Sequence, residues 1–301
     1  MLNKLRFFRD NPVLPDLDRQ RQTAKYHFTK YFGKEDIFLE DISGGTLGIT
    51  FLCDGLKQSQ IFVKTHLSDI AYRNALYKEY QMLKSIYHEK IFLECLHVSV
   101  GNNTELLFLL MDSLKPGCGM SKADIIELIG QYSRNDILKF DGKGMYDISE
   151  LLFEAKKSLY ALDKMGFYSA SIIKIAESLL ICLESYLAVS PRIVCHGDLA
   201  DKNIMINSKD EKILLDWEDA FWGIEGYDYL YWLTFFNHRK FYNEPGIFEV
   251  AGLSPEIAAG ILTLILLIKN AISYYSGEYV NNKLSMDDRL KEIYECMGIG
   301  I

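Results

Sequence analysis

Apolar residues fall into short runs in the first third of the chain and into longer helical patterns afterwards. Residues 61–64 and 106–111 are apolar runs of strand length, whereas residues 72–87 place Leu76, Tyr80 and Leu83 on one helical face. Residues 17–32 also alternate apolar and charged side chains at helical spacing. We therefore expect a strand-rich N-terminal region with one helix in its middle and another on its outside.

The second half of the chain is predicted to be mostly helical. Residues 150–166, 169–189, 253–276 and 284–297 carry apolar faces, and Gly166 separates the first two stretches. Residues 118–147 are polar and form an expected insertion, with a helical patch at 123–129. The most apolar run, 257–268, is too short to cross a bilayer and is interpreted as a buried helix.

Three short apolar runs near residue 200 end in polar side chains. The runs 193–195, 204–206 and 213–215 are expected strands, and the polar residues that follow or separate them are Asp198, Asn203 and Asp216. A carboxylate that accepts a proton, with an amide and a second carboxylate that bind Mg²⁺, is the set of groups that phosphoryl transfer requires. The alternative is a solvated polar turn between buried strands, which would explain a lone His-x-Asp but not this spacing.

Two features of the N-terminal region fit a nucleotide site. Residues 41–53 read as a strand, a glycine-rich turn with Ser43, Gly44, Gly45 and Thr46, and a second strand; such a turn lets backbone N–H groups approach phosphate. Lys64 ends a buried apolar run and needs an anionic partner, and Glu79 lies in the helix that follows. The alternatives are a structural hairpin turn, a surface lysine and a solvated glutamate.

Composition excludes several classes of protein. The chain has 301 residues, 49% of them hydrophobic and 25% charged, which is ordinary for a globular protein. Its formal net charge of −8 argues against a nucleic-acid-binding surface. Six cysteines without a C-x-x-C pair are interpreted as reduced core residues, and residues 1–18 lack the apolar segment of a secretory signal. We expect a cytoplasmic protein without a membrane span.

The motif His196-Gly197-Asp198-Leu199-Ala200-Asp201-Lys202-Asn203-Ile204 resembles the catalytic loop of the aminoglycoside phosphotransferase and choline kinase-like family. The residues 216–220, Asp-Trp-Glu-Asp-Ala, are similar to its D-x-E-x-A motif, and Gly223 with Gly226-Tyr227-Asp228 to its continuation. The resemblance implies that Asp198 is the catalytic base and that Asn203 and Asp216 bind Mg²⁺. It also implies that Lys64 and Glu79 form the ion pair that orients the lysine toward nucleotide phosphates.

The run that ends at Met111 is similar to the interlobe hinge of this family. By resemblance, Met111 lines the back of the adenine pocket, and the backbones of Asp112 and Leu114 bind the base edge, which leaves ATP and GTP both open as donors. After Asp216 the chain is rich in aromatic and acidic residues, which could hold an ammonium group by cation–π contacts. The favoured alternative is that most of these aromatics are core residues and that Asp228 caps a helix.

The resemblance covers nearly all of the chain from Ser43 onward and implies an α+β, bilobal protein-kinase-like fold. We expect an N-terminal lobe of residues 1–115 and a helical lobe of residues 116–301. The implied function is phosphorylation of a hydroxyl on a small molecule, such as an aminoglycoside-like sugar, an amino alcohol like choline or another sugar metabolite. The rivals are a pseudokinase without turnover and a protein kinase. Against the latter, His196-Gly197-Asp198 lacks the arginine of H-R-D, and no A-P-E segment follows.

Overall fold

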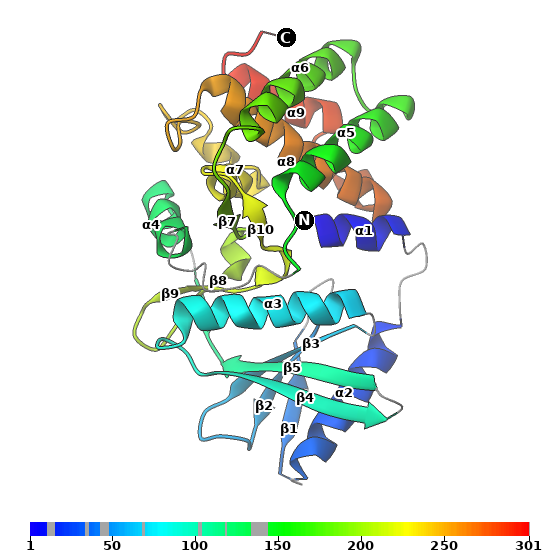
Figure 1. The fold of residues 1–301 in the computed structure, drawn as a ribbon, viewed down its shortest axis with the longest axis vertical. Coiled ribbons are helices and arrows are strands. Elements are labelled where there is room, and N and C mark those ends of the chain that lie inside the picture. Colours follow the sequence, from blue (N-terminus) through cyan, green and yellow to red (C-terminus); the bar gives the residue numbers. More distant parts are fainter. Residues whose placement is uncertain are drawn as a thin grey trace.

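The computed structural model describes residues 1–10, 16–33, 36–42, 48–67, 70–101, 104–117, 119–133 and 144–300. The predicted phosphate-loop residues Ser43, Gly44, Gly45 and Thr46 lie outside these ranges. The chain forms a sheet lobe and a helical lobe, stacked one above the other in Figure 1. This is the bilobal α+β architecture that the sequence predicted.

The sheet lobe contains five antiparallel strands in the order β1-β2-β3-β5-β4. Their bounds are β1 (Phe38–Asp41), β2 (Gly48–Asp54), β3 (Ile61–His66), β4 (Leu93–Gly101) and β5 (Thr104–Asp112). Sequence patterns predicted β2, β3 and β5 but not β4, whose alternate residues are exposed or only half-buried. The two central strands carry Lys64 and the hinge segment toward the lobe boundary.

Two helices cover opposite faces of this sheet (Figure 1). In β5, Leu107 and Leu109 join the core shared with α3 (Ile70–Tyr87), whereas Phe108 and Leu110 join the core under α2 (Leu17–Phe32). This alternation follows from the two-residue period of a strand. Because both faces of β5 are buried, its sequence is a continuous apolar run, as predicted.

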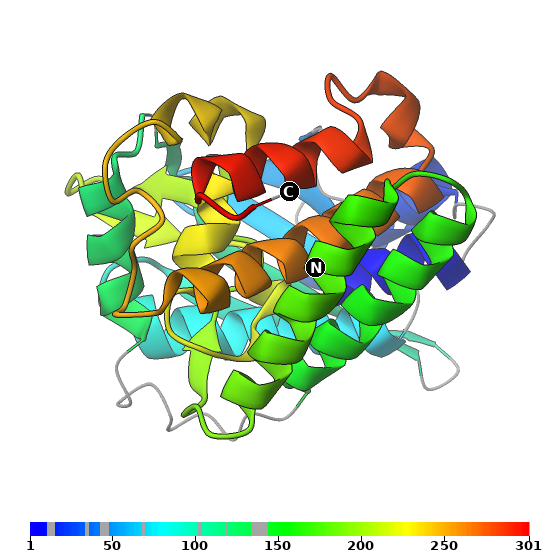
Figure 2. The same cartoon turned by 90° about the horizontal axis from the view of Figure 1, so that it is seen from above.

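The helical lobe is built around one apolar helix. Its helices are α4 (Lys122–Tyr132), α5 (Ile148–Lys164), α6 (Ala170–Leu187), α7 (Tyr227–Leu233), α8 (Pro255–Tyr275) and α9 (Met286–Cys296). Figure 2 shows the pair α5 and α6 alongside α8 and α9, and α8 contacts α5, α6, α7 and α9. By length and composition α8 could cross a membrane, but 78% of its most apolar window is buried, which identifies it as the core helix expected at 257–268.

Polar residues at the helix starts explain where several of these helices begin. Ser121 accepts a hydrogen bond from the amide of Asp124 and Asp147 is paired in the same way with Glu150, both as capping boxes. Each box satisfies backbone N–H groups that the first turn leaves unpaired. The sequence therefore fixes the ends of α4 and α5 locally, inside the region that was predicted as an insertion followed by long helices.

Short strands at the lobe boundary hold the polar loops in place. β6 (Lys115–Pro116), β8 (Ile204–Ile206) and β9 (Lys212–Leu214) form one small sheet, and β7 (Ile193–Cys195) pairs with β10 (Phe221–Gly223). The first sheet joins the segment after the predicted hinge to the strands that flank the predicted site. The second joins the strand before Asp198 to the strand after Asp216.

The first helix, α1 (Leu2–Asp10), was not predicted from the sequence. It contacts α8 of the helical lobe, although it is followed in sequence by the outer helix α2 of the sheet lobe (Figure 1). The predicted division at residues 115/116 assigns α1 to the N-terminal lobe, whereas in the structure α1 packs against a helix of the other lobe.

The cysteine prediction is correct in part. All five described cysteines are free, and Cys53 and Cys195 are buried as expected. Cys182 and Cys296 are exposed, because each lies on the outward face of an amphipathic helix.

Candidate active site

The loop between β7 and β8 places Asp198 at the centre of the site. Gly197 before it has φ of +81°, and a Cβ at this position would lie 2.3 Å from the backbone oxygen of Asp219. Only glycine fits this backbone and this contact. The turn buries the Asp198 side chain at the lobe boundary, 5% exposed.

His196 fixes this loop to the segment that carries Asp216. Its Nε2 lies 2.9 Å from the backbone oxygen of Leu215, and its Nδ1 accepts the amide hydrogen of Asp198 at 3.2 Å. These partners require a neutral ring protonated on Nε2. The histidine of the motif is therefore a buried positioning group that links Asp198 to Asp216.

Asp228 also holds the loop and does not cap α7, which corrects the expectation drawn from the sequence. Its carboxylate accepts hydrogen bonds from the amides of His196 (2.7 Å) and Gly197 (3.0 Å) and from the hydroxyl of Tyr132 (2.7 Å). The N-cap of α7 is Gly226, without a side-chain cap. Burial raises the pKa of Asp228, and these hydrogen bonds oppose that rise. The carboxyl group thus serves the backbone of a distant loop rather than the start of its own helix.

Asp216 follows β9 in a left-handed conformation, with φ 69° and ψ 49°. This region is uncommon for residues other than glycine and is enriched at functional sites. Burial alone would raise the pKa of Asp216, but the ammonium groups of Lys64 and Lys4 lower it to about 2. The side chain is therefore a carboxylate at neutral pH.

The predicted contact between Lys64 and Glu79 is present. The Nζ of Lys64 lies 2.6 Å from Glu79 Oε2, 2.7 Å from Asp216 Oδ1 and 3.3 Å from Glu218 Oε2. Burial would lower the pKa of Lys64, but the three carboxylates raise it well above its ordinary value. Burial and the neighbouring acids raise the pKa of Glu218 to about 7. One ammonium thus faces a group of three acids.

The two residues expected to bind a metal are joined through the loop backbone. The side-chain Nδ2 of Asn203 donates to the backbone carbonyl of Asp198 at 2.9 Å. The backbone carbonyl of Asn203 accepts a hydrogen bond from the amide of Leu215 at 2.8 Å. Among the described residues, the acids whose oxygens lie close enough to share an ion are Glu79, Asp216 and Glu218. Asp216 belongs both to the predicted pair with Asn203 and to this group of three acids. In the structure the ammonium of Lys64 lies among the three acids.

The hinge residues lie at the end of β5, beside this cluster. Met111 is buried and pairs with Phe62 of β3 across the sheet. Asp112 is the last residue of β5, and its side chain accepts the amide of Phe92 at 2.7 Å. Leu114 is half-buried between β5 and β6. The predicted hinge segment thus runs from the end of β5 to β6, and its assignment to a nucleotide base stays a prediction.

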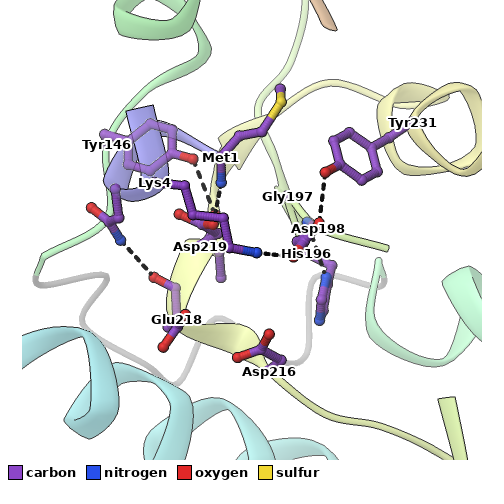
Figure 3. Close-up of polar contacts among 12 residues, drawn as sticks. Met1, Lys4, Tyr146, His196, Gly197, Asp198, Asp216, Glu218, Asp219 and Tyr231 are labelled. Atoms are coloured by element: carbon purple, nitrogen blue, oxygen red, sulfur yellow. Dashed lines mark hydrogen bonds and ion pairs between the residues drawn. The ribbon is translucent and has the colours of Figure 1, made fainter. Parts of the chain in front are cut away.

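Both carboxylate oxygens of Asp198 have side-chain partners (Figure 3). The hydroxyl of Tyr231 donates to Oδ1 at 2.6 Å, and the ammonium of Lys4 donates to Oδ2 at 2.5 Å. Burial would raise the pKa of Asp198, but the charge of Lys4, that of the chain's amino group and these hydrogen bonds hold it well below its usual range. Neither partner was predicted.

Further contacts join α1 to the site. The amino group of Met1 forms an ion pair with the buried carboxylate of Asp219 (Figure 3). Asn3 Nδ2 donates to the carbonyl of Glu218 at 3.0 Å. Leu2 and Leu5 lie one helical turn apart, but nine residues give too short a periodic pattern to predict this helix from the sequence. No local pattern indicates where that helix docks.

The aromatic residues after Asp216 are mostly core, as the favoured alternative held. The side chains of Trp217, Trp232 and Tyr227 are fully buried. Lysine side chains do lie over some of these rings: Lys269 Nζ is 3.8 Å from the ring centroid of Tyr231 and 3.7 Å from that of Phe235, and Lys122 Nζ is 5.5 Å from that of Tyr229. Burial lowers the pKa of Lys269 well below its ordinary value.

Comparison with known proteins agrees with this architecture. The model of a family described as the phosphotransferase enzyme family matches residues 40–252. An apo structure of a thermostable mutant of aminoglycoside phosphotransferase APH(4)-Ia has a TM-score of 0.63 at 14% identity and covers 92% of this chain and 99% of its own.

Two further solved structures are similar to this chain. The GDP and kanamycin complex of APH(2")-IIia has a TM-score of 0.60 at 13% identity, with 92% and 97% of the two chains covered. Choline kinase LicA from Streptococcus pneumoniae has a TM-score of 0.57 at 14% identity, with 93% and 99% covered. A search of curated proteins found no match. At these identities the solved structures establish a kinase-like fold.

Proposed function

Because this chain belongs to the phosphotransferase enzyme family, we propose that it transfers the γ-phosphoryl group of ATP or GTP to a hydroxyl of a small molecule. The observation that carries the proposal is the convergence of Lys64, Glu79 and Asp216 within ion-pair distance, next to the loop of Asp198. Catalysis of phosphoryl transfer consists mainly of positioning and charge stabilisation, which is what such a cluster supplies.

Lys64 is assigned to the nucleotide phosphates, with Glu79 holding it in place. The Glu79 side chain is 2% exposed, whereas the Asp216 side chain is 25% exposed. The buried Glu79 suits a fixed role in orienting Lys64, whereas the more exposed Asp216 can exchange Lys64 for another cation. Ser43, Gly44, Gly45 and Thr46 are assigned to the phosphates, and Met111, Asp112 and Leu114 to the base, on family resemblance.

Asn203 and Asp216 would hold Mg²⁺. Their donor set fits this ion: Asp216 offers a carboxylate with a pKa of about 2, and Asn203, whose Nδ2 already donates to Asp198, has its amide oxygen as its remaining polar atom. When bound, the ion would neutralise charge on the phosphate oxygens. His196 keeps the two ligands in register by bonding to Leu215 and to Asp198.

Asp198 is assigned as the base that receives the acceptor's proton. The acceptor oxygen forms a bond to the γ-phosphorus, the bond from that phosphorus to the β–γ bridging oxygen breaks, and the proton passes to a carboxylate oxygen of Asp198. Tyr231 donates to Oδ1 and orients the carboxylate, so the acceptor would approach Oδ2, which in this structure is paired with Lys4. The acceptor classes that family membership suggests are aminoglycoside-like sugars, amino alcohols such as choline, and other sugar metabolites. We place the reaction in the cytoplasm on the free cysteines.

The test is a screen for nucleotide consumption with pooled aminoglycosides, amino alcohols and sugars, in which release of ADP or GDP is measured. Asp198→Asn should lower kcat by about 10²–10⁴-fold, as expected for a general base, while nucleotide affinity stays within about twofold. The exposed Asp210→Asn is the matched control. Nucleotide binding without turnover in any pool, both in the wild-type protein and in a variant that lacks the Lys4 partner of Asp198, would favour the pseudokinase alternative.

A further inference from the structure

Helix α1 spans the boundary between the lobes at the candidate active site. Met1, Leu2 and Leu5 are buried in the core of the helical lobe, whereas Phe7 is buried in the core under α2. Phe7 packs edge-on against Tyr72 of α3, with ring centroids 5.9 Å apart. A nine-residue helix therefore contributes side chains to both cores and fills space between the lobes.

Polar side chains fix the orientation of α1. Arg9 Nη1 lies 2.7 Å from the buried Glu154, and this ion pair attaches the helix to α5. The pair between Arg6 and Glu150, at 3.3 Å, is about half-exposed on both partners and contributes little. Asn3 donates to the carbonyl of Glu218. Lys4 projects from this frame toward Asp198, as Figure 3 shows.

Lys4 occupies the position that an acceptor hydroxyl needs. A hydroxyl that gives its proton to Asp198 must lie at about 2.6–3.2 Å from one of its oxygens. The Nζ of Lys4 is 2.5 Å from Oδ2, and the hydroxyl of Tyr231 already takes Oδ1. An ammonium group without a free electron pair cannot itself accept a phosphoryl group. Asp198 is only 5% exposed, and Lys4 and Tyr231 fill the space beside its two oxygens, so an acceptor hydroxyl can reach Oδ2 only after Lys4 moves away.

We propose that α1 is an intramolecular occupant of the acceptor site, which blocks phosphoryl transfer until Lys4 leaves Asp198. The inference rests on the proposed function. The occupant is a primary ammonium on a short helix, and its release exposes Oδ2 of Asp198 to the acceptor. Among the described residues, the ion pairs of Lys64 are with Glu79, Asp216 and Glu218, none of which belongs to α1. We therefore expect the nucleotide to bind whether α1 is docked or not.

The docked fraction sets the size of the effect. A minor state of a two-state protein commonly has a population of about 0.1–10%. If only that released fraction is competent, a variant that is fully released gains at least about tenfold in any reaction that needs a free Asp198. Hydrolysis of the nucleotide by water is such a reaction and requires no knowledge of the acceptor.

The experiment compares wild-type protein with Lys4→Met, Lys4→Arg and Arg6→Gln. Met removes the ion pair with Asp198 and has a helix propensity close to that of Lys, so the variant tests docking rather than helix formation. Arg keeps the charge, and Arg6 lies on the same helix but pairs with the half-exposed Glu150. Mg-ATP and Mg-GTP hydrolysis without acceptor is measured together with hydrogen exchange of the α1 amides and nucleotide affinity.

Lys4→Met should hydrolyse nucleotide at least about tenfold faster than wild type, with faster exchange in α1 and unchanged nucleotide affinity. The hydrolysis rates of Lys4→Arg and Arg6→Gln should stay within about threefold of the wild-type rate, which is well below the tenfold gain expected for Lys4→Met. An active wild type that Lys4→Met does not exceed overturns the inference, as does unprotected exchange of α1 in the wild type; both leave the proposed function standing. Nucleotide binding without hydrolysis or transfer in every variant overturns the proposed function instead.

Discussion

Asp228 is expected to be the residue on which the catalytic loop depends most. Its carboxylate, 3% exposed, accepts the amides of His196 and Gly197 and the hydroxyl of Tyr132. Asp228→Ala removes all three acceptor contacts and leaves two backbone N–H groups buried in the turn before Asp198. The substitution tests whether a residue that never touches the reacting atoms controls them through the loop.

The magnitude follows from the number of groups left unpaired. A buried donor that loses its partner costs about 1–3 kcal/mol, so two amides and one hydroxyl cost about 3–6 kcal/mol when partial rearrangement is included. Tyr132→Phe removes only one donor and leaves the two amide contacts intact, with an expected cost of about 1 kcal/mol. The two substitutions share one interaction, so their effects should not add in the double variant.

The assay is urea unfolding followed by far-UV circular dichroism, with turnover measured on the folded variants. Asp228→Ala should lower the free energy of unfolding by about 4 kcal/mol and reduce kcat even where the protein is folded, because the turn at Gly197 loosens. If Asp228→Ala destabilises no more than Tyr132→Phe does, the amide contacts have no energetic role. The assignment of Asp228 as the holder of the loop would then be wrong.

Two more predictions concern neighbouring residues. Gly197→Ala should destabilise the protein by more than Gly166→Ala does. Both glycines have positive φ, but only at Gly197 would a Cβ lie 2.3 Å from a backbone oxygen. The thermal midpoints of the two variants test this, and equal shifts would contradict it. Burial lowers the pKa of Lys78 to about 8. Since an unfolded lysine titrates near 10.4, the unfolded state binds more protons between these values, and stability conferred by this residue rises with pH by about 2 kcal/mol from pH 7 to 10. Lys78→Met should lose that rise, and parallel unfolding curves for wild type and variant across this range would refute it.

Much of the fold follows from local patterns, and the exceptions have a physical explanation. Strand β5 and helix α8 are continuous apolar runs because both are buried on every side. Strand β4 at the sheet edge was missed, since its exposed residues dilute the apolar signal. Helix α1 was missed because nine residues give too short a periodic pattern, and its stability comes from packing in two separate cores.

In the candidate site, too, the contacts between residues close in sequence were predictable and the contacts between distant residues were not. Asp198, Asn203 and His196 lie within eight residues, so their spacing alone indicated a shared loop, and the strand–helix order was enough to pair Lys64 with Glu79. The resemblance also marked Asp228, but its contacts with a loop 32 residues away gave it a different role from the helix cap that a local rule predicts.

The contact that decides whether Asp198 is accessible lies beyond any local rule. Lys4 is 194 residues from Asp198 in sequence, and a lysine in the first turn of a short helix has no feature that distinguishes it from a surface residue. A motif specifies which groups can perform a reaction, because that requires only their types and spacing. Whether those groups are free depends on which distant segment packs over them. If Asp198 is the base that we propose, a chain with an intact motif can therefore rest in a state in which that carboxylate is already paired with Lys4. We then expect activity measured on the wild-type protein alone to underestimate what the loop can do.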